Sequence, residues 1–463
     1  MARPVPDKDH VVGRRAVVIG GSMAGLLTAR VLADHFDEVT LVERDSISAE
    51  PADRKGVPQG RHVHVLLARG LDVLGELFPG VIEELAAEGA ERIDFGTDMR
   101  FQSFGTWKVC FPSGIRCSFQ SRALLEAVVR RRALALEGVR LRSGLRATGL
   151  ELDASGRQVT GVRVEGAVGD ETIPADLVVD ASGRGSRTPA WLEALGYEAP
   201  EESSVRVHVG YASRIYRRPD PMPSTWRALY MLGTETRHRA GVVSPIEGNR
   251  WMVTLIGVLK DYPPADEKGF LEFARNLSSD ELYHAIRDAE PLGPIASHRF
   301  PSHVWRRYER LARLPEGIAV LGDALCSINP VYGQGMTTGA LAAMTLDRCL
   351  REQRRARGPG DLCGLTRAFQ ARVAEVIEVP WRLATGEDLR FPEVEGERTR
   401  SQSMLNWYAR HVHGLCGYDP EVTARFYRVQ HMLSGPQALF HPRVALAVLR
   451  RQLGLDRHLA LGA

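Results

Sequence analysis

The sequence predicts an α/β fold in which a parallel, nucleotide-binding type of sheet is joined to an antiparallel sheet and a helical C-terminal region. Three observations carry this prediction. Residues 14–43 form a strand–turn–helix–strand pattern, residues 204–298 contain short strand-like runs between Pro- or Gly-rich turns, and residues 351–463 are mostly helical in pattern. Strands that alternate with helices indicate a parallel sheet, whereas short runs between turns are typical of antiparallel pairing.

Composition bounds the function. The chain of 463 residues is long enough for two or three packed units of roughly 100–200 residues each. Its formal charge of +3 is small, so we expect a small-molecule substrate and no nucleic-acid partner. No apolar run approaches the roughly 20 residues of a membrane span, and we expect no stable membrane insertion. The six cysteines form no C-x-x-C pair, which predicts no metal site and reduced thiols in a cytoplasmic protein.

The N-terminal unit carries the most information. A strand at Arg15–Ile19 leads into the turn Gly20–Gly25, a helix over Leu26–Ala33 and a second strand at Val39–Val42, which ends in Glu43, 23 residues after Gly20. A pyrophosphate binds well at a helix N-terminus, where free N–H groups and the helix dipole favour an anion. Gly20 suits the tight turn and Gly25 a close helix–strand approach.

The acidic residue of this unit selects the nucleotide. Glu43 can accept hydrogen bonds from both ribose hydroxyls and disfavours a 2′-phosphate, so the resident nucleotide is predicted to be FAD or NAD rather than NADP. Ser22 replaces the middle glycine of G-x-G-x-x-G. Serine is small enough for the phosphate to approach, although a glycine-rich turn that binds no ligand is the alternative.

The remaining elements follow in order. Between the N-terminal unit and residue 352 the patterns predict helices at 65–76 and 80–88, strands within 95–119, a helix from Arg122, a hairpin of 149–152 with 159–165, a buried strand at 176–180, the antiparallel sheet of 204–298, a strand at 317–323 and a helix at 337–352. We therefore assign 1–94, 116–203 and 299–350 to the nucleotide-binding domain, 95–115 and 204–298 to a substrate domain, and 351–463 to a C-terminal helical region.

Two later segments look like further parts of a nucleotide site. The first is Asp180-Ala-Ser-Gly-Arg-Gly-Ser186, and the second runs from Gly322-Asp323 through Pro330 and Gly333-Gln-Gly335 into a helix. Asp323, at the end of a strand, can hold sugar or ribityl hydroxyls, and the Gly-Gln-Gly turn places N–H groups at another helix N-terminus. Each segment alone could be an ordinary strand-to-helix turn, but the three motifs in this order are much more specific.

With these motifs the chain resembles the FAD-dependent aromatic hydroxylase-like flavoproteins, the group A flavin monooxygenases, over residues 14–350. Within that family, Arg54–His64, Asp180–Ser186 and Asn329–Met336 look typical of the bacterial polyketide-tailoring branch near the polyether epoxidases. The resemblance implies a Rossmann-like FAD-binding domain of the glutathione reductase type and an antiparallel substrate domain. The C-terminal helices are then either a cap on the FAD-binding domain or an oligomer interface, and the oligomeric state stays open.

The resemblance also implies roles for matched positions. The turn of Gly20, Ser22, Met23, Ala24 and Gly25 would hold the FAD pyrophosphate, with Glu43 on the ribose and Arg44 near the adenine. Arg54 would reach toward the flavin, Arg122 would contact the pyrophosphate and Asp323 would hold the ribityl chain. Pro330, Gly333, Gly335 and Met336 would border the isoalloxazine. A surface charge is the alternative reading of Arg54, and a solvated helix residue is that of Arg122.

The chain departs from the family pattern in places that concern the reductant. Ser182-Gly183 stands where the family has Asp-Gly, and Pro189 where it has a later arginine, in a motif linked to FAD and NADPH contacts. Cys326 and Thr337 replace a histidine and an asparagine. The sequence contains a single dinucleotide fingerprint, so NADPH or NADH would bind only transiently, as in group A enzymes, or not at all.

The expected activity is FAD-dependent hydroxylation or epoxidation of a large, apolar, polyketide- or terpene-like secondary metabolite. Such chemistry needs no protein nucleophile or paired carboxylates, so catalytic residues stay unassigned, and His62 and His64 read as loop or core histidines. We expect the substrate between the two domains, near some of Tyr211, Trp226, Tyr230 and Trp251. The alternatives are a non-redox, FAD-bound cyclase that performs a [4+2] (Diels–Alder) cycloaddition of a linear polyene, and a flavin reductase or dehydrogenase.

Overall fold

A computed structural model describes residues 12–222, 225–234, 236–396, 398 and 400–453. Its centre is a five-stranded, wholly parallel sheet in the order β17-β11-β1-β2-β7. The strands β1, β11 and β17 are buried over most of their length and read as short apolar runs in the sequence, whereas the edge strand β7 is mostly half-buried or exposed. Their bounds are β1 Gly13–Ile19, β2 Phe36–Glu43, β7 Val139–Ser143, β11 Leu177–Asp180 and β17 Ile318–Val320.

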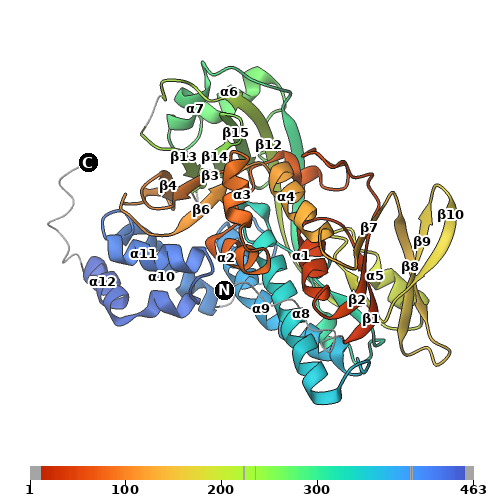
Figure 1. Cartoon of the computed structure of the whole chain (residues 1–463). Coiled ribbons are helices and arrows are strands. Elements are labelled where there is room, and N and C mark those ends of the chain that lie inside the picture. The colour runs from red at the N-terminus through yellow and green to blue at the C-terminus, as the bar shows by residue number, and fades with distance from the viewer. Residues whose placement is uncertain (1–11, 223–224, 235, 397, 399, 454–463) are drawn as a thin grey trace.

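Helices cover this sheet and share its core. In Figure 1, α1 lies beside α4 on one side and beside α8 on the other, and α8 in turn packs against α2 and α9. Apolar side chains from these helices join those of the strands in a single large hydrophobic cluster. The helices are α1 Met23–Leu32, α2 Ala68–Leu77, α3 Val81–Ala87, α4 Arg122–Leu134, α5 Thr188–Ala194 and α8 Gly335–Arg357.

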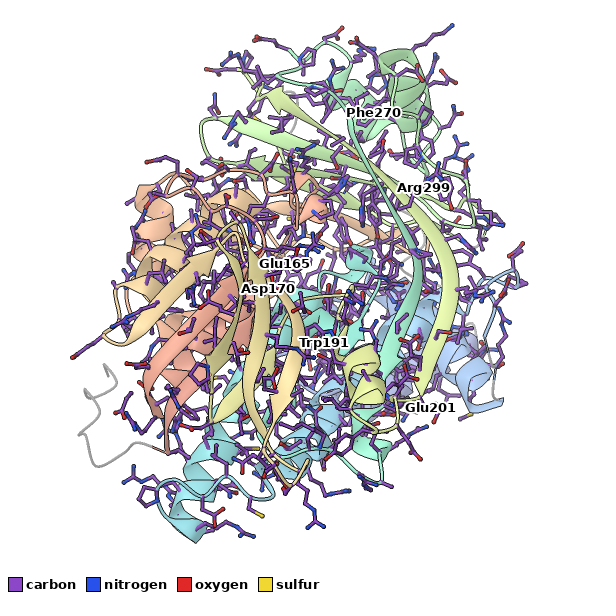
Figure 2. The ribbon with its side chains drawn as sticks, turned by 90° about the vertical axis from the view of Figure 1, so that its right-hand side faces the viewer. Glu165, Asp170, Trp191, Glu201, Phe270 and Arg299 are labelled. Carbon is purple, nitrogen blue, oxygen red and sulfur yellow. The ribbon has the colours of Figure 1, made fainter. Side chains whose placement is uncertain are left out.

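A smaller antiparallel sheet projects from the parallel one. It contains β8 (Arg146–Leu152), β9 (Val159–Gly166) and β10 (Gly169–Pro174) in the order β10-β9-β8. Figure 2 faces this sheet, with Glu165 and Asp170 labelled near its tip. The β8–β9 hairpin matches the expected one, and β10 adds a strand with mostly exposed side chains.

The predicted substrate domain is built on an eight-stranded sheet in the order β18-β16-β12-β15-β14-β13-β4-β5. Its neighbours are antiparallel except for β13 and β4, which are parallel. The predicted boundaries at 203/204 and 298/299 fall inside β12 and β16, two long strands that pair along most of their length. The strands are β4 Met99–Ser103, β5 Thr106–Trp107, β12 Glu202–Arg217, β13 Ala228–Met231, β14 Arg239–Ile246, β15 Arg250–Gly257, β16 Ala296–Arg306 and β18 Cys326–Ser327.

Two helices within 204–298 cover one face of this sheet. They are α6 (Glu267–Arg275) and α7 (Glu281–Ile286), which bury apolar side chains such as Phe270 and Leu282 against β14 and β15. The prediction of a sheet in this segment is confirmed, but it did not include these helices. A separate two-stranded ladder of β3 (Glu91–Asp94) and β6 (Arg116–Phe119) flanks the sheet.

The C-terminal region is helical, as predicted. The first of its helices, α9 (Leu365–Asp388), packs along α8 and contributes to the main core. The others form a small cluster of their own beside β4 and β5, where Val109 N–H donates to the Cys416 carbonyl. They are α10 Arg400–Leu415, α11 Pro420–Gln430 and α12 Pro442–Gln452. Short 3₁₀ turns occur at 58–61, 308–310, 322–324, 330–332 and 436–440. Among the described residues, no helix is long and apolar enough to cross a membrane.

Candidate functional site

The three sequence motifs meet at one cavity of about 500 Å³. It opens at the carboxyl ends of β1, β2 and β11, where ligands of open α/β sheets bind. Its size is within the range of small-molecule and cofactor sites, roughly 300–1,000 Å³. Of the residues proposed for the cofactor, Gly20, Ser22, Met23, Ala24, Glu43, Arg44, Arg54, Arg122, Asp323, Pro330, Gly333, Gly335 and Met336 line the cavity, and Gly25 lies just behind its wall.

The turn before α1 is too tight for side chains. A Cβ on Gly25 would lie 1.8 Å from the Gly20 carbonyl oxygen, and one on Gly20 would lie 2.5 Å from the Ala181 carbonyl oxygen. Gly20 also has a φ of +105°, which L-residues with side chains rarely adopt. Ser22 occupies the N-cap of α1 without a side-chain cap bond, which leaves the first N–H groups of the helix for another acceptor. The cradle therefore fits a phosphate group.

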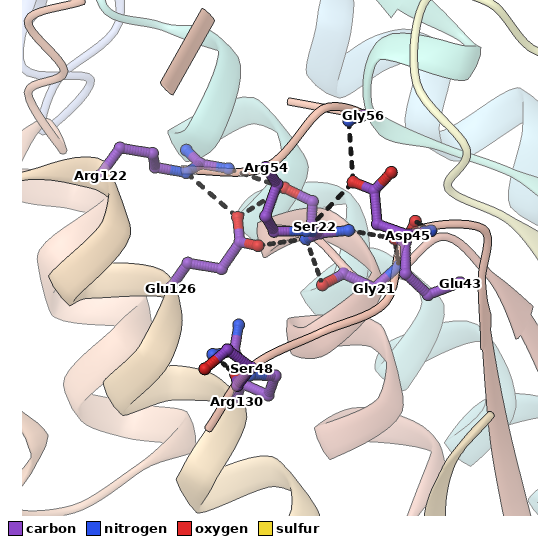
Figure 3. Close-up of polar contacts among 10 residues, drawn as sticks. All are labelled: Gly21, Ser22, Glu43, Asp45, Ser48, Arg54, Gly56, Arg122, Glu126 and Arg130. Atoms are coloured by element: carbon purple, nitrogen blue, oxygen red, sulfur yellow. Dashed lines mark hydrogen bonds and ion pairs between the residues drawn. The ribbon is translucent and has the colours of Figure 1, made fainter. Parts of the chain in front are cut away.

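The Ser22 hydroxyl instead joins a buried polar cluster (Figure 3). It donates to Glu126 at 2.8 Å and accepts from Arg122 at 2.9 Å, and Glu126 also contacts Arg54. Arg54 in turn forms a 2.5 Å ion pair with Glu43, whose other contacts include the N–H of Gly21 at 2.8 Å. This cluster ties the 54–64 segment, the Gly20–Gly25 turn and α4 together.

Charge compensation maintains the ionised state of this cluster. Burial disfavours the charged form of Arg54, yet Glu126 and Glu43 hold the pKa of its guanidinium above its usual value. Burial likewise opposes the charge of Glu126, but Arg122 and Arg54 hold the pKa of that carboxyl below its ordinary range. Within the described chain, the hydrogen bonds and ion pairs of Arg54 go to Glu43, Asp45, Glu126 and the Gly21 carbonyl, and none reaches 330–336. Its proposed approach to the flavin stays a prediction.

Asp180, at the end of β11, and Asp323, in the turn after β17, differ in their hydrogen-bond partners. Asp180, fully buried, accepts hydrogen bonds from Ser182 N, Ser186 Oγ and Thr188 Oγ1, so its carboxylate fixes the 180–188 loop. Asp323 faces the cavity and makes no side-chain hydrogen bond among the residues that the structure describes. Burial raises its pKa, although Arg122 and Arg184 oppose that rise. A half-buried carboxylate that faces a cavity without donors fits a ligand that brings hydroxyl groups.

Sequence reasoning missed several residues of this site. Glu126 has only its i,i+4 spacing from Arg122 as a signal, because its contacts with Ser22 and Arg54 join distant parts of the chain. Arg187 and Trp191 also line the cavity, and the buried indole N–H of Trp191 has no hydrogen-bond partner among the residues that the structure describes. Within the described chain, no group of three or more His, Cys, Asp or Glu side chains could hold a metal ion.

A second, smaller pocket of about 70 Å³ adjoins the cavity. Residues of the segments 59–65 and 330–333 line both spaces, so these segments separate them. Tyr211 and Tyr230, two of the four aromatic candidates, line the small pocket. The other two, Trp226 and Trp251, stack on each other at 5.7 Å in the cluster under α6 and α7. None of the described residues that line this pocket is Asp, Glu, Lys or Arg.

Comparison with known proteins identifies the family. Residues 14–363 match the model of the "FAD binding domain" family, so the chain belongs to this family, whose fold is that of the group A aromatic hydroxylase-like flavin monooxygenases. The predicted family and fold class are thereby confirmed. The chain carries an FAD-binding domain, and the Gly20–Gly25 cradle and unpartnered Asp323 fit that cofactor.

Individual relatives agree with this assignment. The chain is 35% identical over 406 residues to Protein Rv3254 of Mycobacterium tuberculosis, covering 84% of this chain and 82% of that one. It is 23% identical to kynurenine 3-monooxygenase of Salinispora arenicola, over 73% of this chain and 72% of the relative. The structure of OxyS anhydrotetracycline hydroxylase from Streptomyces rimosus shares the fold, with a TM-score of 0.61, 18% identity and coverage of 91% of this chain and 76% of that chain.

Proposed function

We propose that the protein is an FAD-dependent monooxygenase that hydroxylates or epoxidises a large, apolar, polyketide- or terpene-like metabolite. One observation carries this proposal: an apolar pocket adjoins the cavity of the FAD-binding domain across a shared wall that includes Pro330 and Gly333. A substrate in the pocket would lie next to the predicted flavin end of the cavity. When bound, FAD would be reduced by a nicotinamide and would activate O₂. The protein would position the substrate and exclude water from the site.

The chain's own residues have separable roles in this proposal. The Gly20–Gly25 turn and Arg122 would hold the pyrophosphate, Glu43 the ribose and Asp323 the ribityl hydroxyls. Arg44 is exposed at the edge of the cavity, where it would meet the adenine end. Pro330, Gly333, Gly335 and Met336 would form the wall toward the substrate. NADPH or NADH would visit the open side of the cavity, near the Ser182–Gly185 loop that lines it.

The charge of the pocket argues for an uncharged substrate. Kynurenine, which the Salinispora relatives' name gives as substrate, is an amino acid with an ammonium and a carboxylate group. A buried charge needs a counter-ion, and the described lining of the small pocket supplies none. Anhydrotetracycline, in the name of the structural relative, is a polyketide and closer to the proposed class.

The test is the mass of the product. FAD-loaded protein is incubated with neutral polyketide ketones, NADPH or NADH and isotopically labelled O₂, and products are analysed by mass spectrometry. Gain of one labelled oxygen supports the proposal. An unchanged mass with a new structure would favour the [4+2] cyclase, and a gain of two hydrogens would favour a reductase. If neither nicotinamide bleaches the flavin with any substrate, the monooxygenase proposal is wrong.

A further inference from the structure

The small pocket contains two buried imidazoles whose Nε2 atoms have no hydrogen-bond partner in the described chain. His62 is 5% exposed and His431 is 0% exposed, and both line the pocket. They come from different walls. His62 rests on the β12–β15 side, whereas His431 follows α11 and lies against α2 and Phe95. A buried polar atom without a partner is costly, so two in one pocket call for an explanation.

The hydrogen bonds of His62 fix which ring nitrogen carries its proton. Val63 N–H donates to Thr254 Oγ1 at 3.0 Å, Thr254 and Ser213 hydroxyls are 2.6 Å apart, and Ser213 Oγ lies 2.7 Å from His62 Nδ1. If each hydroxyl donates to the next group, every proton has an acceptor and Nδ1 accepts. The reverse order would leave the buried Thr254 proton unused. His62, whose ring lines the pocket, therefore carries its proton on Nε2, the nitrogen that has no partner in the described chain.

His431 reaches the same state by another route. The backbone N–H of Ala68 donates to His431 Nδ1 at 3.2 Å, so Nδ1 is an acceptor and the ring proton sits on Nε2. The Cys117 thiol lies 3.8 Å from the same Nδ1. Ala68 and His431 are 363 residues apart in the chain, and their contact places the end of α11 on the start of α2.

Both imidazoles are neutral at physiological pH. Burial lowers the pKa of His62 to about 3, with smaller contributions from His298, His64 and Arg61, and burial alone lowers that of His431 to about 3. The pocket thus offers two uncharged N–H donors on a mostly apolar surface that includes Leu67 and Ile256. Such donors pair well with neutral acceptor oxygens, whereas a carboxylate or ammonium would be desolvated without a counter-ion.

We propose that this pocket binds the oxygenated part of a neutral substrate, with His62 and His431 donating Nε2–H to acceptor oxygens of the ketone or quinone type. The proposal deepens the proposed function and rests on it for the reaction, but the binding step can be tested alone. It names the substrate class as carbonyl-bearing and uncharged, and it gives the C-terminal region a direct part in recognition through His431.

The first test compares three ligands with the same bicyclic carbon skeleton on the FAD-loaded protein. Binding of α-tetralone, tetralin and tetralin carboxylate is measured by calorimetry and by the change in flavin absorbance. We expect the ketone to bind about tenfold more tightly than the hydrocarbon, because one hydrogen bond to an otherwise unpaired donor is gained. The carboxylate should not bind measurably. Equal binding of ketone and hydrocarbon, tighter binding of the carboxylate, or no ketone binding would overturn the assignment.

The second test assigns the effect to the two histidines. The double variant H62L/H431L should lose the preference for ketone over hydrocarbon and keep its binding of tetralin. H284L makes the same replacement at a half-exposed histidine on α7 and should keep the preference. Retention of the ketone preference in a folded, FAD-loaded double variant would contradict the proposal. If that variant does not fold, the ligand comparison on the unmodified protein decides.

Outcomes for binding and for reaction separate cleanly. Ketone-selective binding that depends on both histidines, combined with no oxygen incorporation in any assay, would uphold the pocket assignment and refute the monooxygenase. Oxygen incorporation combined with binding that does not depend on the carbonyl group would uphold the monooxygenase and refute the pocket assignment.

Discussion

The carboxylate of Asp388 accepts a 2.6 Å hydrogen bond from the hydroxyl of Tyr332. Asp388 ends α9 and is almost completely buried, and Tyr332 lies in the 330–333 turn between the two cavities. Two further donors converge on Asp388: Nε2 of His303 at 2.6 Å and Nδ2 of Asn329 at 3.0 Å. Asn329 Oδ1 accepts from Tyr211 at 2.6 Å, so one carboxylate links the C-terminal region to the wall of the small pocket.

Replacing this carboxylate should loosen the turn. D388A leaves three donors without an acceptor, and each buried, unpaired donor costs roughly 1–3 kcal/mol. We expect the free energy of unfolding in urea to fall by at least about 3 kcal/mol and the flavin absorbance of the FAD-loaded protein to change. Y332F removes a single donor and should cost less. If D388A were no more destabilising than Y332F, Asp388 would not organise the turn.

The Gly20–Gly25 turn gives a second prediction. In G25A the new methyl group would overlap the Gly20 carbonyl oxygen, so the turn must move even though Gly25 does not itself line the cavity. We expect the purified variant to contain little FAD and to lose roughly 1–3 kcal/mol of stability. FAD is measured as flavin absorbance per chain.

G293A serves as the matched control for that change. A Cβ on Gly293 meets nothing within 4 Å, so this variant should bind FAD as the unmodified protein does. Full FAD content in G25A would show that the turn does not hold the cofactor.

The sequence predicted the parallel core well because local signals and burial agree there. Glycines whose space is restricted, such as Gly20 and Gly25, and continuous apolar strands such as β11 mark this core directly. Several elements were not predicted, among them the edge strand β7 of the parallel sheet, the strand β10 and the helices α6 and α7. The strand β10 is exposed at five of its six positions and shows no alternation, and α6 lies in a segment read only as turns between strands. The Asp266 cap and the spacing of Phe270, Phe273 and Ala274 are signals that could have revealed α6.

In the candidate site, only those residues were predictable that a pattern of neighbouring residues in the sequence marks. The turn, Glu43 and Asp323 follow from strand ends and glycine spacing, and the structure gathers them at one cavity. The partners of Arg54 and the donors of His62 and His431 were not predictable. They depend on contacts such as Arg54 with Glu126 and His62 with Ser213, between segments 72 and 151 residues apart. A single sequence carries no periodic pattern for such pairs.

Burial of His431 predicts a distinct pH dependence of stability. Its pKa is lowered from 6.5 to about 3 in the folded state, so between these values the unfolded chain binds a proton that the folded chain does not. Stability therefore rises with pH across this window and is lost on acidification, by about 1.4 kcal/mol per pH unit for one group. Relative to the unmodified protein, H431F should gain about 2 kcal/mol between pH 6.5 and 5. Urea unfolding at several pH values measures the free energy of unfolding of both proteins. If that free energy changed with pH in the same way in both, the prediction would be wrong.

Asp323 predicts opposite effects on stability and on cofactor binding. Burial raises its pKa despite the nearby Arg122 and Arg184, so at neutral pH its charge opposes folding of the FAD-free protein. D323N removes that charge and should make the FAD-free protein more stable in thermal unfolding. The same change replaces a charged acceptor for the ribityl hydroxyls. We expect FAD to bind roughly tenfold to a hundredfold more weakly, as for loss of a hydrogen bond to a charged group, measured by flavin fluorescence titration.

Asp180 provides the control for that replacement. Asp180 ends β11 and Asp323 lies in the short turn after the neighbouring strand β17, but the two carboxylates differ in their hydrogen-bond partners. Asp180 already accepts three hydrogen bonds from its own loop, so D180N exchanges a satisfied anion for an amide that cannot accept all three. D180N should therefore lower the stability of the FAD-free protein, whereas D323N raises it. The contrast follows from hydrogen bonding, because the carboxylate of Asp180 has three donors whereas that of Asp323 has none among the described residues. Destabilisation of the FAD-free protein by D323N as well would mean that Asp323 holds the fold rather than the cofactor.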